Sequence, residues 1–178
     1  MLKDTVNAYG RISVINHWLL ALLMIVMLAL GLTFEQLDNG PLKSELRNWH
    51  KSLGMLVLLL GMWRVAWRIV QGFPEAAGAY LPWEKMLARA VHVFLLAMIL
   101  IMPLSGYFMS TSTGRSINMF GLFEIGGLIQ SKGVKDFAHS VHGFFPNLLI
   151  AIIVLHIGAA LKHHFKDKDA TLRRMLRF

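Results

Sequence analysis

Four long runs of apolar residues, separated by polar segments, dominate the sequence. They extend over about residues 12–34, 49–70, 88–109 and 137–161. At a rise of ~1.5 Å per residue, each run is long enough as a helix to cross the hydrocarbon core of a membrane, which is ~30 Å thick. The pattern therefore predicts an all-α fold: a single domain over residues 1–178 that forms a four-helix transmembrane bundle.

The segments between these runs have the composition of loops. Residues 35–46 contain the turn sequence Asn39-Gly40-Pro41, a strong turn signal. The longest connection, residues 110–135, is predicted to form a structured loop or a re-entrant surface piece. Pro103 lies inside the third run and predicts a kink there. The first run is too long for the apolar part of a secretory signal, so we predict a spanning helix.

The distribution of positive charge predicts the orientation of the spans. Lysine and arginine total 18 against 10 acidic residues, which gives a net charge of +8. With four spans both termini lie on one side, and that side carries twelve of the basic residues against six on the other. The positive-inside rule then predicts that both termini are cytoplasmic. Because the basic residues cluster at the ends of the apolar runs, we interpret them as topology signals and lipid contacts, and we expect no binding of nucleic acid.

Histidine is the residue type that this pattern does not explain. Ionisable side chains at membrane depth are costly, so they are functional candidates by default. Near the ends of helices, histidines can instead lie in the headgroup zone. Seven of the eight lie inside the apolar runs or close to their ends, and the eighth follows the last run; they are His17, His50, His92, His139, His142, His156, His163 and His164.

Spacing sorts four of these histidines into two levels. His142 and His156 are 14 residues apart, so on one helix they are separated by ~21 Å along the axis and by only about 40° around it. His17 lies near the cytoplasmic end of the first run, at the level of His156. His50 opens the second run at the level of His142. Because facing side chains build the cofactor sites of four-helix bundles, we predict two pairs, His17–His156 and His50–His142.

The chemistry of these pairs favours haem iron over zinc. Zinc sites usually have four ligands, and no carboxylate lies at membrane depth to complete one. Cysteine is absent, which excludes iron–sulfur clusters and covalently attached c-type haem, so two non-covalent b-type haems are expected. A haem bound by two histidines has no open position at iron and favours electron transfer. Arg64 and Arg68 are candidate partners of the propionates. Gly54 and Gly143 offer space for a flat macrocycle, although Gly54 can equally serve helix packing.

Several short motifs, in their order and spacing, resemble the bacterial cytochrome b561 family. They are H-W-L at His17, W-H-K-S-L-G from Trp49, W-R-V-A-W-R at the end of the second run, and the stretch from His142 through His156 to L-K-H-H-F. The similarity extends over essentially the whole chain. It implies four transmembrane helices in the bacterial inner membrane and two b haems bound by His17, His50, His142 and His156. It also implies a quinone such as ubiquinone as electron partner and, from one relative, superoxide oxidation.

The remaining histidines leave alternatives open. His92 could replace His17 as a ligand, form a hydrogen bond with a propionate or line a quinone pocket. His139 could exchange with His142. His163 lies seven residues after His156 on nearly the same stripe of the helix and suits a propionate or a quinone headgroup. His164 is predicted to be solvated.

The sequence therefore predicts a membrane cytochrome with two haems that relays single electrons between a quinone and a partner on one face, and it admits a superoxide:quinone oxidoreductase. Two other functions stay open. The chain could be a haem-bearing anchor subunit that takes electrons from a partner protein, a soluble dehydrogenase or reductase. It could also be a histidine-rich transporter of a metal or of protons. The electron donor and the direction of flow are not predicted.

Overall fold

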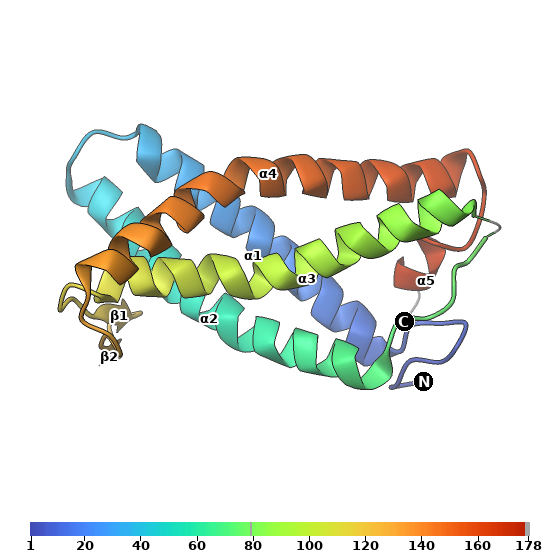
Figure 1. Cartoon of the computed structure of the whole chain (residues 1–178), viewed down its shortest axis with the longest axis horizontal. Coiled ribbons are helices and arrows are strands. Elements are labelled where there is room, and N and C mark those ends of the chain that lie inside the picture. Colours follow the sequence, from blue (N-terminus) through green and yellow to red (C-terminus); the bar gives the residue numbers. More distant parts are fainter. Residues whose placement is uncertain (79, 177–178) are drawn as a thin grey trace. The chain divides into compact units, whose positions relative to one another are not determined.

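The structure is a computed structural model that describes residues 1–78 and 80–176. Within them, four helices are long and apolar enough to cross a membrane, which confirms the predicted all-α, four-helix transmembrane fold class. A short fifth helix and a two-stranded antiparallel hairpin complete the secondary structure (Figure 1). The elements are α1 (Arg11–Gln36), α2 (Pro41–Gln71), α3 (Pro82–Thr111), β1 (Ile117–Met119), β2 (Phe123–Ile125), α4 (Lys132–Phe165) and α5 (Arg173–Leu176).

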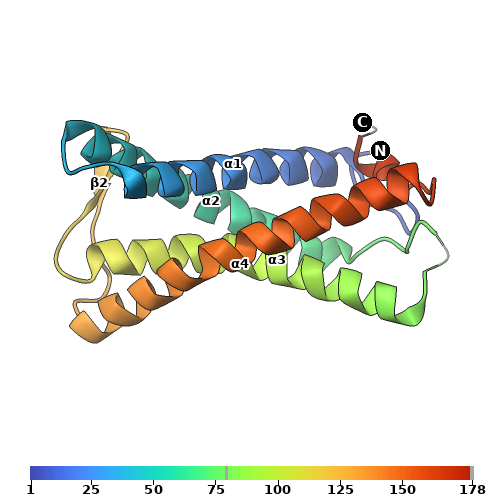
Figure 2. The ribbon, with the colours of Figure 1, turned by 90° about the horizontal axis from the view of Figure 1, so that it is seen from above.

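The long helices extend beyond the apolar runs that predicted them, because polar residues at their ends carry helix-starting and helix-ending signals. α2 begins at Pro41 and α3 at Pro82, and proline suits the first helical position, where an N–H would have no partner inside the helix. α2 is followed by Gly72 at a φ of 68°, a left-handed conformation that commonly ends helices. The loop expected over residues 35–46 contracts to residues 37–40 as a result (Figure 2).

The chain divides into two compact units, and each contains part of all four long helices. Unit 1 comprises Met1–Leu19, Met62–Met98 and Asn147–Phe178. Unit 2 comprises Leu20–Gly61 and Ile99–Pro146. The predicted pair His17–His156 falls in unit 1 and the pair His50–His142 in unit 2, so each unit is described by itself.

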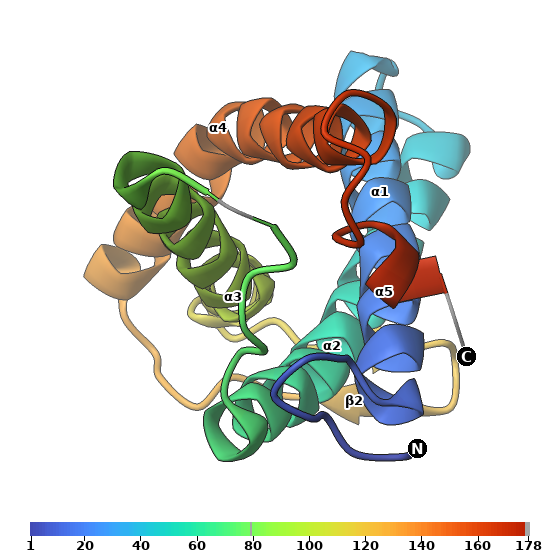
Figure 3. The ribbon, with the colours of Figure 1, turned by 90° about the vertical axis from the view of Figure 1, so that its right-hand side faces the viewer.

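In unit 1, the N-terminal segment folds back onto α1 and α2. The Asp4 carboxylate accepts a hydrogen bond from the Ser13 hydroxyl at 2.8 Å and forms an ion pair with the Arg68 guanidinium at 2.9 Å. Both charged side chains are almost fully buried, at 2% and 3% exposure. Figure 3 shows α5 beside the first turns of α1, where the Trp18 indole donates a hydrogen bond of 2.6 Å to the Met175 carbonyl. These contacts fix the polar end of unit 1.

In unit 2, the long connection predicted as a structured loop contains the β1–β2 hairpin, beside the end of α3 and the start of α4 (Figure 1). Buried Tyr107 on α3 donates a hydrogen bond to the Gly126 carbonyl at 2.8 Å. The Ser52 hydroxyl on α2 donates to the Asn118 carbonyl on β1 at 2.7 Å. The hairpin and its flanking residues are therefore attached to α2, which carries His50, and to α3.

Candidate haem sites

The histidine pair of unit 2 joins α2 and α4. The ring centroids of His50 and His142 lie 6.1 Å apart, and their planes are inclined by 86°. The His142 Nδ1 atom lies 3.0 Å from the Met102 carbonyl oxygen and 3.0 Å from the Ser105 hydroxyl. An Nδ1–H that donates to a backbone carbonyl leaves Nε2 as the free donor atom, an arrangement typical of histidines that bind metals.

His50 lies in a tighter, less polar environment. Its ring meets the Phe34 ring edge to face, with centroids 5.3 Å apart and planes at 83°. Its Nδ1 atom is buried without a hydrogen-bond partner within the described residues. The backbone of Met27 on α1 also interacts with this imidazole, so His50 packs against α1.

Two glycines border these imidazoles, and Gly106 leaves room for the His142 ring. A Cβ atom added at Gly106 on α3 would lie 3.0 Å from the His142 Cε1 atom, and one at Gly31 on α1 would lie 3.5 Å from the His50 Cε1 atom. Sequence reasoning had identified Gly54 and Gly143 instead. A Cβ at Gly54 meets the side chain of Met27 at 3.4 Å, whereas at Gly143 no atom of the described structure lies within 4 Å. Gly143 therefore borders open space, and Gly54 serves packing.

Unit 1 brings together three imidazoles. His17 on α1 and His156 on α4 have ring centroids 6.3 Å apart with planes at 60°. His92 on α3 also meets His156, with centroids 5.3 Å apart and planes at 85°. Among the hydrogen bonds of the described residues, none ends on a ring nitrogen of His17 or His156. Both rings are therefore free to bind a metal.

The two predicted pairs have the separation that a shared metal requires. A metal–nitrogen bond of ~2.0 Å and a ring radius of about 1.1 Å would place each centroid ~3.1 Å from a shared metal, so two imidazoles on opposite sides of it would have centroids ~6.2 Å apart. The observed separations of 6.3 Å and 6.1 Å agree with this value. The 5.3 Å between His92 and His156 is too short for a metal between the rings and corresponds to direct contact. The donor sets of both pairs therefore fit a haem bound by two histidines.

The two arginines of unit 1 differ in their partners. Both side chains are buried, and both are close enough to His17 to interact with it electrostatically. Arg68 is engaged by Asp4 and by the Ser13 hydroxyl. Among the described residues, Arg64 donates one hydrogen bond, from Nη1 to the Ser13 carbonyl at 3.1 Å, although a guanidinium carries five N–H donors. Arg64 is therefore better placed than Arg68 to bind a further anionic group, such as a haem propionate.

His163 belongs to a polar cluster at the end of α4. Its Nδ1 atom lies 2.9 Å from Asp167 and 2.9 Å from Asp169, and its ring centroid lies 4.7 Å from that of Tyr80. Burial raises the pKa of Tyr80, and the nearby Asp169 carboxylate adds to this shift. Burial also acts to raise the pKa of Asp169, but hydrogen bonds from Thr171 and Tyr80 outweigh it, so this pKa lies below its ordinary value. The cluster therefore holds a carboxylate in its ionised form.

Two further histidines lie in other surroundings. His139, a possible substitute for His142 by its position in the sequence, is exposed on the surface of α4. His164 was predicted to be solvated, but it is half-buried, and its Nδ1 atom has no hydrogen-bond partner within the described residues. Its ring packs edge to face against Phe165, with centroids 4.8 Å apart.

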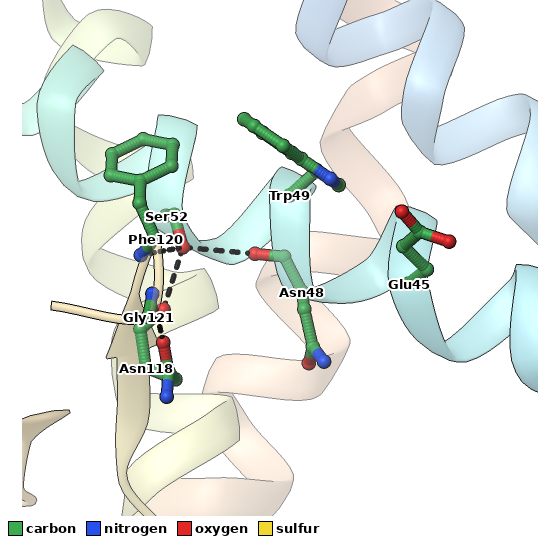
Figure 4. Close-up of a pocket in the computed structure, with 7 residues that line it drawn as sticks. All are labelled: Glu45, Asn48, Trp49, Ser52, Asn118, Phe120 and Gly121. Carbon is green, nitrogen blue, oxygen red and sulfur yellow. Dashed lines mark hydrogen bonds between the residues drawn. The ribbon is translucent and has the colours of Figure 1, made fainter.

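A cavity of about 340 Å³ opens on unit 2 between α2 and the hairpin (Figure 4). The rings of Trp49 and Phe120 form its aromatic part, with centroids 5.5 Å apart. Phe120 has a φ of 54°, which is unusual for a bulky residue. The sequence does not predict this cavity, because a tryptophan at the end of a span is typical of an anchor at the membrane interface. Its lining residues are Glu45, Asn48, Trp49, Ser52, Asn118, Phe120 and Gly121.

Four spanning helices with two pairs of facing imidazoles define the class of multi-pass membrane cytochromes. The family model for prokaryotic cytochrome b561 matches residues 8–178, so the chain belongs to this family. The chain is 37% identical over 177 residues to "Cytochrome b561 homolog 2" of Escherichia coli (strain K12), with 97% of this chain and 93% of the relative covered. It is 26% identical over 170 residues to "Probable superoxide oxidase CybB" of Yersinia pestis, with 94% and 95% covered.

Membership confirms the resemblance that the motifs indicated. The chain is a multi-pass bacterial membrane protein of a family that carries b-type haem and transfers electrons in the membrane. This favours electron transfer over the alternative of a histidine-rich transporter. The relative from Cereibacter sphaeroides, "Cytochrome b562", is 24% identical over 174 residues, with 95% of each chain covered.

Proposed function

We propose that the chain holds two b-type haems, one in each unit, and passes single electrons from one to the other. His17 and His156 would hold one haem, and His50 and His142 the other. The observation that carries this proposal is the separation of the ring centroids, 6.3 Å in one pair and 6.1 Å in the other. Haem, when bound by these histidines, would supply one-electron redox chemistry.

Haem quantification in the purified protein tests this proposal. We expect two haems per chain in the wild type and one in each of the variants His50→Ala and His156→Ala. The control is His139→Ala, which removes an exposed histidine of α4 and should leave two haems. A ligand variant that retains both haems would remove that residue from the proposed set.

The electron acceptor is proposed to be a membrane quinone that binds near His163. Reduction of a quinone to a quinol takes two electrons and two protons, and the cluster of His163, Asp169 and Tyr80 offers groups that can relay protons. The hydrogen bonds found for the His163 ring use Nδ1, so Nε2 is available to a quinone carbonyl. We expect His163→Gln to lower the rate of quinone reduction at least severalfold while both haems and their potentials stay unchanged. Retention of the full rate would exclude this location.

Superoxide is the electron donor that we propose at unit 2. Lys51 lies within electrostatic range of Arg47 and Arg115, and a basic cluster attracts small anions. Two superoxide anions would each lose one electron to give dioxygen, and one quinone would take both electrons with two protons. We expect Lys51→Ala to slow superoxide-driven quinone reduction severalfold at low ionic strength and much less in ~1 M salt. Equal rates for this variant and the control Lys43→Ala would contradict the proposal.

The proposed location is the bacterial inner membrane, with both termini in the cytoplasm. The excess of basic residues on the side of the termini supports it. Reporter fusions at the C-terminus and at Gly126 in the α3–α4 connection should report opposite sides.

The stand-alone relay differs from a haem-bearing anchor subunit in one measurable respect, since an anchor would copurify with a second polypeptide.

A further inference from the structure

A third imidazole contacts one member of the unit 1 pair without sharing a metal with it. The His92 ring meets the His156 ring edge to face, with centroids 5.3 Å apart and planes at 85°. This geometry is characteristic of packed aromatic rings, whose centroids lie ~4.5–7 Å apart. The contact between His92 and His156 is therefore a packing contact between two rings.

Unit 2 contains the same arrangement with a residue that has no polar chemistry. There Phe34 meets His50 edge to face, with centroids 5.3 Å apart and planes at 83°. A phenylalanine can neither bind a metal nor form a hydrogen bond with a propionate, yet it has the position relative to His50 that His92 has relative to His156. In both units a flat ring lies edge to face with one imidazole of the pair. Phe34 and His92 therefore share a packing role.

The side chains behind His92 hold it in place. The centroids of the Phe73 and His92 rings lie 6.0 Å apart. Phe73 is in turn contacted by two guanidinium groups, with the Cζ atom of Arg89 at 4.0 Å and that of Arg68 at 5.1 Å from its centroid. The buried ion pair with Asp4 fixes Arg68. A connected set of side chains therefore runs within unit 1 from a buried ion pair to the His156 ring.

His156 needs such support more than His142 does. The Nδ1 atom of His142 lies 3.0 Å from the Met102 carbonyl, and hydrogen bonds of this kind fix the ring orientation of metal-binding histidines. Within the described residues, no hydrogen bond to the His156 ring is found. Unless another group restrains it, this imidazole can rotate about the bond between Cβ and the ring.

We propose that His92 is a positioning residue that packs against His156 and fixes the plane of its imidazole. The inference rests on the proposed function, in which His156 binds the haem of unit 1. In a low-spin ferric haem, the relative orientation of the two axial imidazole planes determines the g values of the electron paramagnetic resonance (EPR) spectrum. Loss of the packing contact should therefore change the signal of one haem without removing that haem.

The test compares three substitutions in the haem-loaded protein. Since Phe34 shows that a phenylalanine can take this place, His92→Phe should keep the wild-type EPR signal and both haems. His92→Ala should keep both haems but shift and broaden one of the two low-spin signals. Phe73→Ala should change the same signal by a smaller amount. The matched control, Phe34→Ala, should change only the other signal.

Other outcomes would overturn the inference. Two unchanged signals in His92→Ala would show that His92 does not orient the ring. If His92→Phe shifts the signal as much as His92→Ala and His92→Gln restores it, His92 acts through a hydrogen bond, as a propionate partner would. Loss of one haem in both His92→Phe and His92→Ala would identify a ligand. The wild-type haem count reports on the proposed function separately, since fewer than two haems per chain contradicts that function before any variant is compared.

Discussion

The two histidine pairs have nearly the same separation but different surroundings. In unit 2, His142 is hydrogen-bonded to a backbone carbonyl, and glycines border both rings. In unit 1, no hydrogen bond to the pair is found within the described residues, and buried arginines and a third imidazole surround it. One donor geometry is thus combined with two ways of tuning a haem: a hydrogen bond that makes the ligand more basic, and positive charge close to the pair.

Under the proposed function, this difference predicts different reduction potentials for the two haems. A more basic imidazole stabilises the oxidised state, which lowers the potential in unit 2. Positive charge from buried Arg64 stabilises the reduced state, which raises the potential in unit 1. The basic cluster around Lys51 in unit 2 is more exposed, so its charges are screened by water and salt. Electrons should therefore pass from the unit 2 haem to the unit 1 haem, in the direction that superoxide oxidation at unit 2 and quinone reduction at unit 1 require.

The largest expected effect comes from a glycine of unit 2. In Gly106→Leu, the new side chain would begin 3.0 Å from the His142 Cε1 atom and displace that ring. We expect the haem content to fall from two per chain to one, with the unit 1 signal intact in the EPR spectrum. Gly158→Ala on α4 is the control, because a Cβ there meets no atom of the described structure within 4 Å. Two haems in Gly106→Leu would show that the glycine does not shape the site.

The second-largest expected effect is a loss of stability that affects unit 1 alone. Asp4→Asn breaks the buried ion pair with Arg68, and loss of one partner of such a pair costs about 3–5 kcal/mol. We expect a lower thermal unfolding midpoint in detergent and a broader EPR signal from the unit 1 haem only. Asp38→Asn, at an exposed position in the turn between α1 and α2, should change neither. Equal broadening of both signals would argue against a specific link to unit 1.

The potentials themselves can be shifted one at a time. Arg64→Gln removes a buried positive charge near His17, so the midpoint potential of the unit 1 haem should fall. A charge worth about 1 kcal/mol corresponds to roughly 40 mV for a one-electron couple. Redox titration should show this fall in one of two components. Lys43→Gln, the same change of charge in unit 2, should leave the unit 1 potential unchanged. If the lower-potential component moves in Arg64→Gln, the assignment of potentials to units is reversed.

The sequence predicted those parts of the site that follow from the spacing of residues along a single helix. His142 and His156 lie on a single helix with a fixed rise and twist, so their shared face follows from their spacing. The runs of apolar residues predicted the four spans in the same way. The structure brings together both predicted pairs, although spacing alone left His92 and His139 as alternative ligands.

What the sequence did not predict depends on how one helix is rotated against the next. The contacts of His92 with His156 and of Phe34 with His50 join residues of different helices, and packing rather than local sequence sets such contacts. The same holds for Gly106, which leaves space for the His142 ring on another helix. The predicted helices are also shorter than the observed ones, because hydropathy does not detect helical turns made of polar residues.

The smallest expected effect concerns the polar cluster of unit 1, for which unit 2 has no counterpart among the described residues. Because the pKa of Asp169 lies below its ordinary value of 3.8, its ionised form stabilises the fold at pH values above that value. This contribution should be complete at neutral pH and should disappear as the pH falls through the lowered pKa. Unfolding midpoints of wild type and Asp169→Asn should therefore differ slightly at pH 7 and converge in acid. A difference that grows in acid would mean that the neutral carboxyl is the stabilised form, and the cluster could not then hold an ionised carboxylate next to His163.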